Sequence, residues 1–521
     1  MFAGIRVSNS YGLDNRTGAG AVKDVSSLLA EHGAIVLGQP PMHNLHRDAN
    51  QGWSGHYCIG NLDSDLVALE TKYPYYGGFT RACVLSHVCW VPTTSQWNYF
   101  SSDATHILQN GFSLSTSNAG GRHGDKLSLR VVSHRIPNSA HVAKIRGLTA
   151  VMGERIAPNL GHFVWEGAFA LLTSMSQLGV YTGNLNVLRT SARAAKDPRL
   201  FAAFSDAFLA PLTGHSFNAS TRGWVRTLDQ LRKAYSSSHL ICFEELQAGG
   251  AYNVFDSEAL NVGREGLIAL FRHRVLHWHG LNPRALRPAE RPRILLVNKT
   301  SVNSNRLVRI ILNFDEVSHY VRTRFGAHAD IQVTGFASMP LAEQLALVTS
   351  TSVAFSPCGG ISMILPFLRH GAYAMLINYI IRSANPNYEG PHGECAVSIT
   401  PPQSAVLHTV VAYVPVHILR AHVPLYCRAA QNCSWTMEAE LWRHVRHVHM
   451  HYYRILDASD VPVPRLTTGA GAIDNTGSDG YHGQRDANVH INLTRLHGLI
   501  HSALKELVPH LVEDSHLGTF G

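Results

Sequence analysis

Short apolar runs that alternate with helical segments constrain the fold of this chain more than any other feature. From about Lys126, the runs LSLRVVSH and HLICFEEL enclose the helical segment GHFVWEGAFALLTSMSQLG. After residue 292, the runs ILLVNKT, HADIQVTGF, VAFS and AMLINY follow, with the helical stretch MPLAEQLALVTS among them. Strands that alternate with helices are typical of βαβ units with parallel strands. We therefore predict an α/β protein built on parallel sheets.

The two alternating series are separated by HGLNPRALRPAERPR, residues 279–293, which is rich in proline and arginine. A chain of 521 residues is also too long for one ordinary core. We predict two Rossmann-like α/β lobes, residues 126–285 and 286–400, with a ligand cleft between them. An irregular N-terminal region, residues 1–125, precedes them, and a C-terminal extension, residues 401–521, follows.

The C-terminal extension contains one clear amphipathic segment, INLTRLHGLIHSALKELVPHL. Its apolar residues recur at helical spacing and form a single stripe. The members of the stripe are Leu493, Leu496, Ile500, Leu504, Leu507 and Leu511. We predict a helix here that packs across the two lobes.

The charge and composition limit the partners of the chain. The net charge is +8 and the pI is about 9.1, but no block of lysine or arginine stands out. Diffuse basicity favours an anionic small ligand, and nucleic-acid binding stays as an alternative that depends on the pI alone. No run of about 18 apolar residues occurs, and the start MFAGIRVSNS lacks the apolar region of a signal peptide. We expect contact with a membrane only through an anchor outside this chain.

The eight cysteines leave two alternatives open. No CxxC pair occurs, so a zinc ribbon is not expected. The even number fits disulfides formed in a secretory compartment, and it also fits buried thiols.

The segment VAFSPCGGISMILPFLRHGA, residues 353–372, breaks an apolar strand at two glycines and restarts as an apolar helix. Gly359 and Gly360 permit tight turns at positive φ and let a ligand approach the backbone. A helix that starts near Ile361 leaves its first amides without internal partners, and such amides favour an anion such as a diphosphate. The alternative is a turn that serves packing alone.

His162 and Glu166 lie four residues apart at the start of a predicted helix, so their side chains share one face. Either group is a candidate general base. The alternative is that His162 caps the helix and Glu166 is a favourable acid in its first turn.

Three stretches resemble glycosyltransferase family 61, in the order in which that family carries them. The stretch at residues 343–378 is similar to the family's catalytic signature, a helix, a strand, a glycine-rich turn and a second strand. The stretch ILLVNKTSVNSNRLVRIILNFDEV resembles its basic strand end and the following motif, and APNLGHFVWEGAFALL resembles its Asn-x-x-His-x-x-x-acid helix. The matching residues are Glu343, Gln344, Gly360, Ile361, Ser362, Gly371, Ala372, Lys299, Arg309, Asn313, Glu316, Asn159, His162 and Glu166.

The resemblance implies an inverting transfer of a sugar from a nucleotide-sugar, usually a UDP-sugar, to a hydroxyl of a glycan or glycoprotein. It also implies a GT-B-like fold, no required metal or other cofactor, and a place in the Golgi or endoplasmic reticulum lumen. Glu166 or His162 would be catalytic. The donor would be held by Lys299, Arg309, Glu343, Gln344, Gly359, Gly360, Ile361 and Ser362.

Some of these residues have simpler alternatives. Arg309 could pair with Asp315 or Glu316 on a surface helix, and Glu343 and Gln344 could cap their own helix.

Two positions depart from the family's pattern. Pro357, followed by Cys358, replaces the family's histidine in the glycine-rich turn, and Asn378 replaces its acidic residue after the last strand. These departures favour the first alternative function, a non-catalytic relative that binds a glycan or a nucleotide.

The segment LWRHVRHVHMHYYRIL is rich in histidine, and His444, His447 and His451 share one face if it is a helix. Such a face could bind a metal. A solvated basic helix face explains the same pattern, and we therefore predict no metal site.

Overall fold

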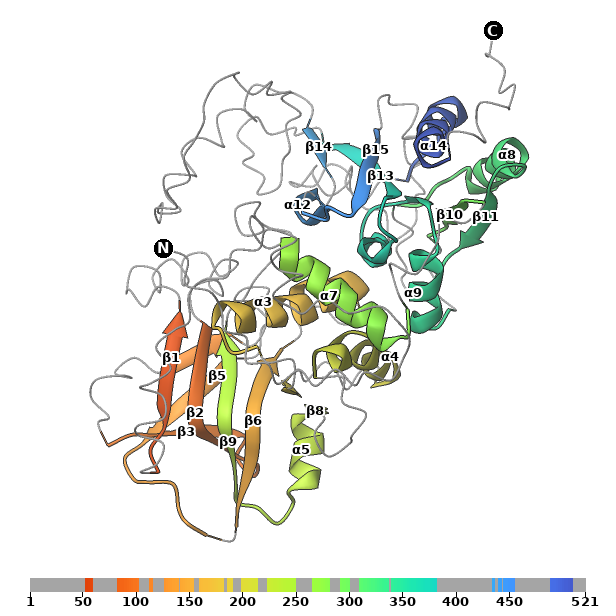
Figure 1. Ribbon diagram of the computed structural model, residues 1–521. Coiled ribbons are helices and arrows are strands. Elements are labelled where there is room, and N and C mark those ends of the chain that lie inside the picture. The colour runs from red at the N-terminus through yellow and green to blue at the C-terminus, as the bar shows by residue number, and fades with distance from the viewer. Residues whose placement is uncertain are drawn as a thin grey trace, which may run out of the picture. The chain divides into compact units, whose positions relative to one another are not determined.

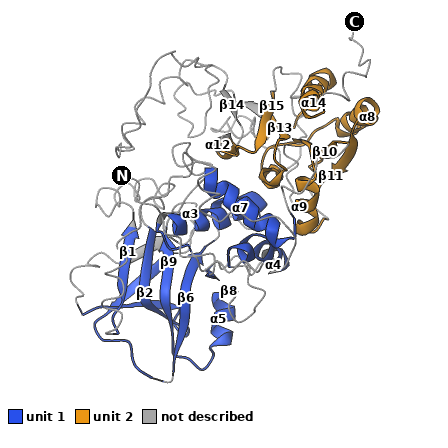
Figure 2. Ribbon diagram, viewed as in Figure 1, with its two compact units in different colours: residues 1–283 blue, residues 284–521 orange. Residues whose placement is uncertain are grey.

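A computed structural model of the chain shows helices and sheets with parallel strands, which confirms the α/β class (Figure 1). Two compact units, Met1–Pro283 and Arg284–Gly521, divide the chain within its proline- and arginine-rich segment (Figure 2). The residues that the structure describes are 52–59, 82–102, 112–115, 126–139, 141–153, 159–181, 185–190, 198–213, 223–249, 265–281, 291–299, 309–336, 339–381, 433–435, 439–442, 444–454 and 488–508.

A mixed nine-stranded sheet forms the centre of the first unit, in the order β4-β5-β3-β2-β9-β6-β7-β8 with β1 beside β2. The run β9-β6-β7-β8 is parallel, whereas β2 is antiparallel to its neighbours β1, β3 and β9. The strands are β1 Gly55–Ile59, β2 Ala82–Val91, β3 Gln96–Phe100, β4 Phe112–Ser115, β5 Lys126–Val132, β6 Val142–Met152, β7 Asn186–Arg189, β8 Val225–Thr227 and β9 Leu240–Gly249.

This sheet differs from the Rossmann-like lobe expected for residues 126–285. Strands β1 to β4 belong to residues 1–125, for which we expected irregular structure, and they join the same sheet as β6 and β9. The reason lies in β2, whose sequence ACVLSHVCWV is buried along most of its length. A strand buried on both faces lacks the polar alternation by which an antiparallel strand is usually recognised.

Two disulfides decide the question that the cysteines left open. Cys58 pairs with Cys83 and Cys89 pairs with Cys242, and each bond joins residues directly opposite each other on antiparallel strands. Cys358, in the second unit, is a buried free thiol. Among the described cysteines, disulfides and a buried thiol therefore both occur.

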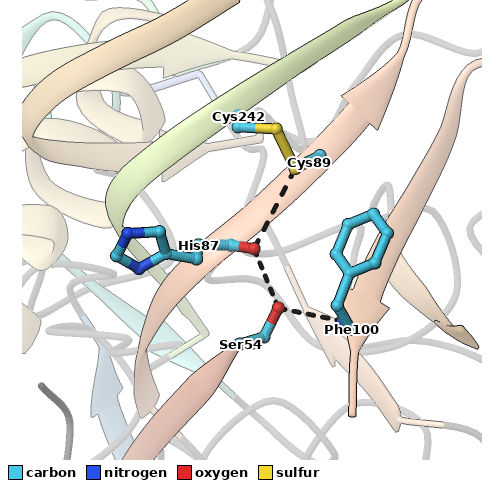
Figure 3. Close-up of a disulfide and its surroundings, with 5 residues drawn as sticks. All are labelled: Ser54, His87, Cys89, Phe100 and Cys242. Carbon is cyan, nitrogen blue, oxygen red and sulfur yellow. Dashed lines mark hydrogen bonds between the residues drawn. A yellow bond between two sulfur atoms is a disulfide. The ribbon is translucent and has the colours of Figure 1, made fainter. Parts of the chain in front are cut away.

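A hydrogen-bond relay lies beside the Cys89–Cys242 disulfide (Figure 3). The Ser54 hydroxyl donates to the carbonyl oxygen of His87 at 2.8 Å and accepts from the amide of Phe100 at 2.9 Å. His87 has a φ of 56°, which is uncommon for a residue other than glycine. The relay satisfies backbone groups at the point where β2 departs from regular strand geometry.

Helices of the first unit include two π-helical segments, a form that is rare and frequent at functional sites. The π-helix η3 leads directly into α3, so the helix predicted after residue 160 is present. Helix α7 contacts both α3 and η5, and η3 contacts η5. The helices are η3 His162–Ala168, α3 Phe169–Gln177, α4 Pro198–Phe204, η5 Ser205–Leu209, η6 Ala210–Thr213, α5 Leu228–Ala234 and α7 Glu265–Trp278.

The second unit has a doubly wound parallel sheet. Strands β11, β10, β12, β13 and β15 are parallel neighbours in that order, and β14 adds to β13 in the antiparallel sense. In chain order the parallel strands lie 2-1-3-4-5, so the strand order reverses between β10 and β12. The strands are β10 Arg293–Val297, β11 Asp330–Thr334, β12 Val353–Ser356, β13 Ala372–Ile381, β14 Cys433–Trp435 and β15 Val448–Arg454.

One face of this sheet is covered by α8 and α14, whose apolar side chains share a core with β10, β12 and β13. The predicted stripe of α14 is real, since Leu496, Ile500 and Leu504 are buried. The contacts that bury it are with α8, β12 and β15 of the same unit, where we expected packing across the lobes. The helices of this unit are α8 Phe314–Phe325, α9 Leu341–Thr349, η7 Ser362–Phe367, α12 Ala439–Trp442 and α14 Leu493–Leu507.

Candidate functional site

The candidate donor site lies at the carboxyl ends of β10 and β12. Lys299 follows the end of β10 by two residues, and Gly359 follows the end of β12 by three. Leu296 pairs with Phe355 in the sheet, so the same register carried forward sets Lys299 level with Cys358. Ligands of open α/β sheets bind outside the carboxyl ends of the strands where the strand order reverses. The topology therefore places the predicted turn at the position where a ligand is expected.

Arg309 lies directly against this turn. A Cβ atom on Gly359 would be 2.7 Å from Nη1 of Arg309, closer than real side chains come. Gly359 also has a φ of 109°, a conformation that only glycine adopts readily. The guanidinium thus occupies the space that any larger residue at 359 would fill, so Arg309 lies over the glycine turn and not on the outer face of α8.

The backbone that carries Arg309 is itself unusual, because Arg309 has a φ of 58°. Residues 310–313 are bonded to residues 488–491, a pair of segments that we call the clasp. The amide of Ile310 donates to Oδ1 of Asn488 at 3.1 Å. Asn313 bonds the backbone of Ile491 twice, accepting from its amide at 2.8 Å and donating to its carbonyl at 3.0 Å. The C-terminal region therefore holds the arginine loop in place.

The segment after the glycines is a 3₁₀ helix of six residues, η7, and not the α-helix that we predicted. Pro366 lies inside it and cannot donate the hydrogen bond that an α-helix needs. The amide and the hydroxyl of Ser362 both donate to the carbonyl of Gly359, at 2.9 and 2.7 Å. Ser362 therefore closes the turn, and the predicted row of α-helical amides is reduced to the turn around Gly360 and Ile361.

The side chain of Gln344 is hydrogen-bonded to two backbone carbonyls of the loop between β11 and α9. Its Nε2 donates to the carbonyl of Met339 at 2.7 Å and to that of Phe336 at 3.1 Å. Phe336 has a φ of 62°, so the glutamine braces a strained loop that follows β11. The side chain of Gln344 therefore does not cap its own helix, and Glu343 is exposed in the first turn of α9.

The two departures from the pattern of glycosyltransferase family 61 lie in different elements: Pro357 and Cys358 follow β12, and Asn378 lies within β13. Pro357 and Cys358 are buried directly after β12, and Ser356 donates its hydroxyl to the Pro357 carbonyl at 2.8 Å. Packing thus accounts for the residues that stand where the family has a histidine. Asn378 lies opposite Arg454 in the backbone register of β13 and β15.

The candidate base lies in the first unit, at the start of η3. Nδ1 of His162 is hydrogen-bonded to Oε2 of Glu166, and their side chains are 18% and 6% exposed. Asn159 caps this helix, because its Oδ1 accepts from the amide of Gly161 at 2.9 Å. His162 is therefore not the cap. The pair has a buried carboxylate that orients a more accessible imidazole, as in known acid–base pairs.

A second polar cluster lies where β7 ends, next to the same helix. Arg189 is 5% exposed, and its Nη1 donates to the hydroxyl of Ser205 at 2.5 Å. Its guanidinium carbon lies 5.7 Å from the centre of the Phe163 ring, and Phe163 packs on Phe204 at 5.2 Å. We did not predict Arg189 from the sequence. A cation that ends the apolar run NVLR was the signal available, since β7 ends at this edge of a parallel sheet.

The histidine-rich segment forms the strand β15 from Val448 to Arg454, and His444 and His447 precede that strand, so the helix on which both of our interpretations depended is not formed. His447 bonds the carbonyl of Pro366 through Nε2 at 2.9 Å, and the His449 ring stacks on Tyr373 at 4.8 Å. The alternation VHMHYY fits a strand, and we counted it at helical spacing. Among the described residues, no group of three or more histidine, cysteine, aspartate or glutamate side chains could hold a metal.

None of the described helices is both long and apolar enough to cross a membrane.

The comparisons with known proteins give a weak structural likeness. No family model and no curated protein matches the chain, so the resemblance to glycosyltransferase family 61 stays a prediction. Among solved structures, the chain is similar to the bacterial iron-containing dodecameric glycosyltransferase TibC from enterotoxigenic E. coli H10407, with 12% sequence identity and a TM-score of 0.23. The likeness covers 58% of this chain and 76% of the TibC chain. Such a TM-score assigns neither fold nor activity here.

Proposed function

We propose that the chain is a glycosyltransferase, a divergent relative of family 61, that moves a sugar from a nucleotide-sugar to a hydroxyl of a glycan or glycoprotein. The observation that supports this most is the guanidinium of Arg309 against Gly359, at the point where the order of parallel strands reverses. A cation held there over a glycine turn suits a diphosphate, which needs positive charge and close approach to the backbone.

The departing UDP is the chemical problem that the second unit would solve. Breaking the bond between the sugar and the diphosphate leaves negative charge on the phosphate oxygen. Arg309, Lys299 and the backbone at Gly360 and Ile361 would stabilise that charge in place of a metal ion. Preorganised donors of this kind are often the largest contribution to catalysis.

The acceptor hydroxyl must lose its proton as it attacks the sugar carbon from the face opposite the diphosphate, which inverts the configuration. We assign the proton to Nε2 of His162, because Nδ1 bonds the Glu166 carboxylate and fixes the ring's tautomer. General base catalysis of this kind contributes about 10²–10⁴ in rate. Glu166 is then a positioning residue.

The disulfides of the first unit support a place in the Golgi or endoplasmic reticulum lumen, since such bonds form and persist in oxidising compartments. Proteins of these compartments modify glycans and glycoproteins, which agrees with the proposed acceptor.

Release of UDP from a panel of UDP-sugars, measured in a coupled assay, tests the proposal. We expect release that falls about 10²-fold or more in Arg309→Met and His162→Ala, and less in Glu166→Gln. Arg226→Met is the control, because it removes an arginine that lies on the Trp224 ring at 5.0 Å and belongs to neither candidate group. Binding of UDP without release from any donor would contradict the enzyme and favour a non-catalytic relative, which the buried Pro357 and Cys358 suggest.

A further inference from the structure

Helix α7 of the first unit carries a buried cation that neither candidate group uses. Arg274 is 5% exposed, and its guanidinium carbon lies 5.0 Å from the centre of the Tyr181 ring, just after α3. Two of its nitrogens, Nε and Nη1, are buried and have no hydrogen-bond partner among the residues that the structure describes. The ring covers one face of the guanidinium and leaves these in-plane donors unsatisfied.

A guanidinium in this state is costly. Buried polar groups in folded proteins are almost always hydrogen-bonded, and buried charges are almost always paired. A cation–π contact with Tyr181 offsets part of the charge, but it satisfies none of the N–H donors. A water molecule would satisfy a donor and leave the charge uncompensated. An anion would do both.

Arg272, two residues earlier on α7, is a second buried arginine of the same helix. It is 8% exposed, and burial lowers its pKa to about 9. Phe271, on the same helix, packs against Trp165 and Phe169 at 5.7 Å each, which fixes this part of α7 against η3 and α3. The cation at Arg274 is therefore held on a packed helix and not on a mobile side chain.

We propose that Arg274 and Tyr181 form a binding site for an oxyanion group, a phosphate or a sulfate, in the first unit. The planar guanidinium donates to the oxygens from its edge, and the tyrosine ring supports its face. The site shares no residue with Arg309 and Gly359, so it is independent of the proposed donor site. The group is either a free inorganic ion or part of a larger ligand such as a sulfated or phosphorylated glycan.

Thermal unfolding of the full chain in 20 mM sodium phosphate, against sodium chloride of equal ionic strength, tests this site. We expect phosphate to raise the Tm by about 2–4 °C, because a ligand of the folded state stabilises it by mass action. Arg274→Met should lose this rise and should not be less stable than the wild type in chloride, because it removes an uncompensated buried charge. Arg274→Lys, which keeps the charge with fewer donors, should retain a smaller rise.

Two further variants separate this proposal from the proposed function. Arg226→Met should keep the full phosphate effect, since it removes an arginine stacked on a ring without a buried unpaired donor. Arg309→Met should also keep the part of the rise that depends on Arg274. If phosphate raises the Tm equally in the wild type and in Arg274→Met, or if only Arg309→Met removes the rise, the proposed site at Arg274 is wrong. The proposed donor site at Arg309 and Gly359 would be unaffected by that result. The absence of any rise would exclude the free ion as the ligand and leave only an oxyanion group carried by a larger ligand.

Hydrogen exchange of the full chain distinguishes a free oxyanion from one that is part of a glycan. Inorganic phosphate alone should slow exchange in the α7 peptide, residues 265–278, if the free ion is the ligand. If only a sulfated or phosphorylated oligosaccharide slows it, the group is part of a glycan. Exchange in α7 that ignores all of these ligands contradicts the proposal even where Arg274→Met fails to fold.

Discussion

At the scale of single residues, the strongest constraint is at Gly359, where the backbone conformation and Arg309 both exclude a side chain. Gly359→Ala should cost about 1–3 kcal/mol through strain at positive φ. It should also push the guanidinium from the turn and weaken UDP binding about tenfold or more. Isothermal titration with UDP, beside urea unfolding, measures the two effects.

Gly371→Ala is the control for this substitution, because Gly371 has a φ of 77° and nothing lies within 4 Å of the position of its Cβ. Gly371→Ala should lower the free energy of unfolding through the same backbone strain at positive φ and leave the affinity for UDP unchanged. Equal losses of affinity in the two variants would show that strain alone matters, and that Arg309 does not hold the diphosphate.

Some of these residues could be predicted from the sequence and others could not. The turn at Gly359 was predictable because glycine pairs permit positive φ, and the contact of His162 with Glu166 was predictable because residues four apart share one face of a helix. The hydrogen bonds of Gln344 and Ser362 could not be predicted, since their partners are backbone carbonyls that only the folded loops supply. Nothing in the sequence around Arg274 predicted its burial without a hydrogen-bond partner among the described residues at Nε and Nη1, because that burial arises only when α7 is packed.

At the scale of elements, the clasp joins the arginine loop to a segment 178 residues away. Asn313→Ala removes two hydrogen bonds to Ile491 and should destabilise the second unit by about 1–3 kcal/mol. It should also weaken UDP binding, because the loop that holds Arg309 is freed. The UDP dissociation constant and the urea midpoint are the measurements.

Asn492→Ala separates stability from positioning. Asn492 caps α14, its Oδ1 accepting from the amide of Arg495 at 3.0 Å, so its loss should cost about 1 kcal/mol. Because it does not touch the arginine loop, UDP affinity should persist. A parallel loss of affinity in both variants would mean that affinity follows general stability and not the clasp.

Helix α14 should also detach more readily in acid. Burial lowers the pKa of His451 and of His497, so their neutral forms are favoured in the folded unit. The stability from this effect is complete above the ordinary value of 6.5 and is lost as the pH falls through the depressed pKa values. The protection factors for hydrogen exchange in residues 493–507, which correct for the pH dependence of the intrinsic exchange rate, should therefore be lower at pH 5.5 than at pH 7.5.

Neighbouring charged groups also shift the pKa values of these two histidines, some upward and some downward. Glu506 raises the pKa of His451, while His449 lowers it, and His501 and Arg324 lower that of His497. His497→Gln, which cannot be protonated, should make the pH effect smaller. An α14 peptide whose protection is the same at both pH values would refute this account.

At the scale of the whole molecule, the second unit was the predictable one. Its parallel strands alternate with helices in the sequence, so the pattern of each βα unit is local. The first unit was not, because β2 pairs with β9, whose residues lie more than 150 positions away in the chain. Such pairing depends on which apolar surfaces meet in the folded unit, so no local pattern in the sequence predicts it.

The two units should differ in their response to reduction for the same reason. The Cys89–Cys242 disulfide closes a loop with a sequence separation of 153 between β2 and β9, so its loss should destabilise the first unit by about 4–5 kcal/mol. Among its described residues, the second unit has Cys358 as a buried thiol beside the glycine turn. Thermal unfolding with and without reductant should therefore show one transition that falls steeply and one that UDP still raises. If reductant abolishes the UDP effect while the second transition stays in place, the proposed donor site does not belong to the second unit alone.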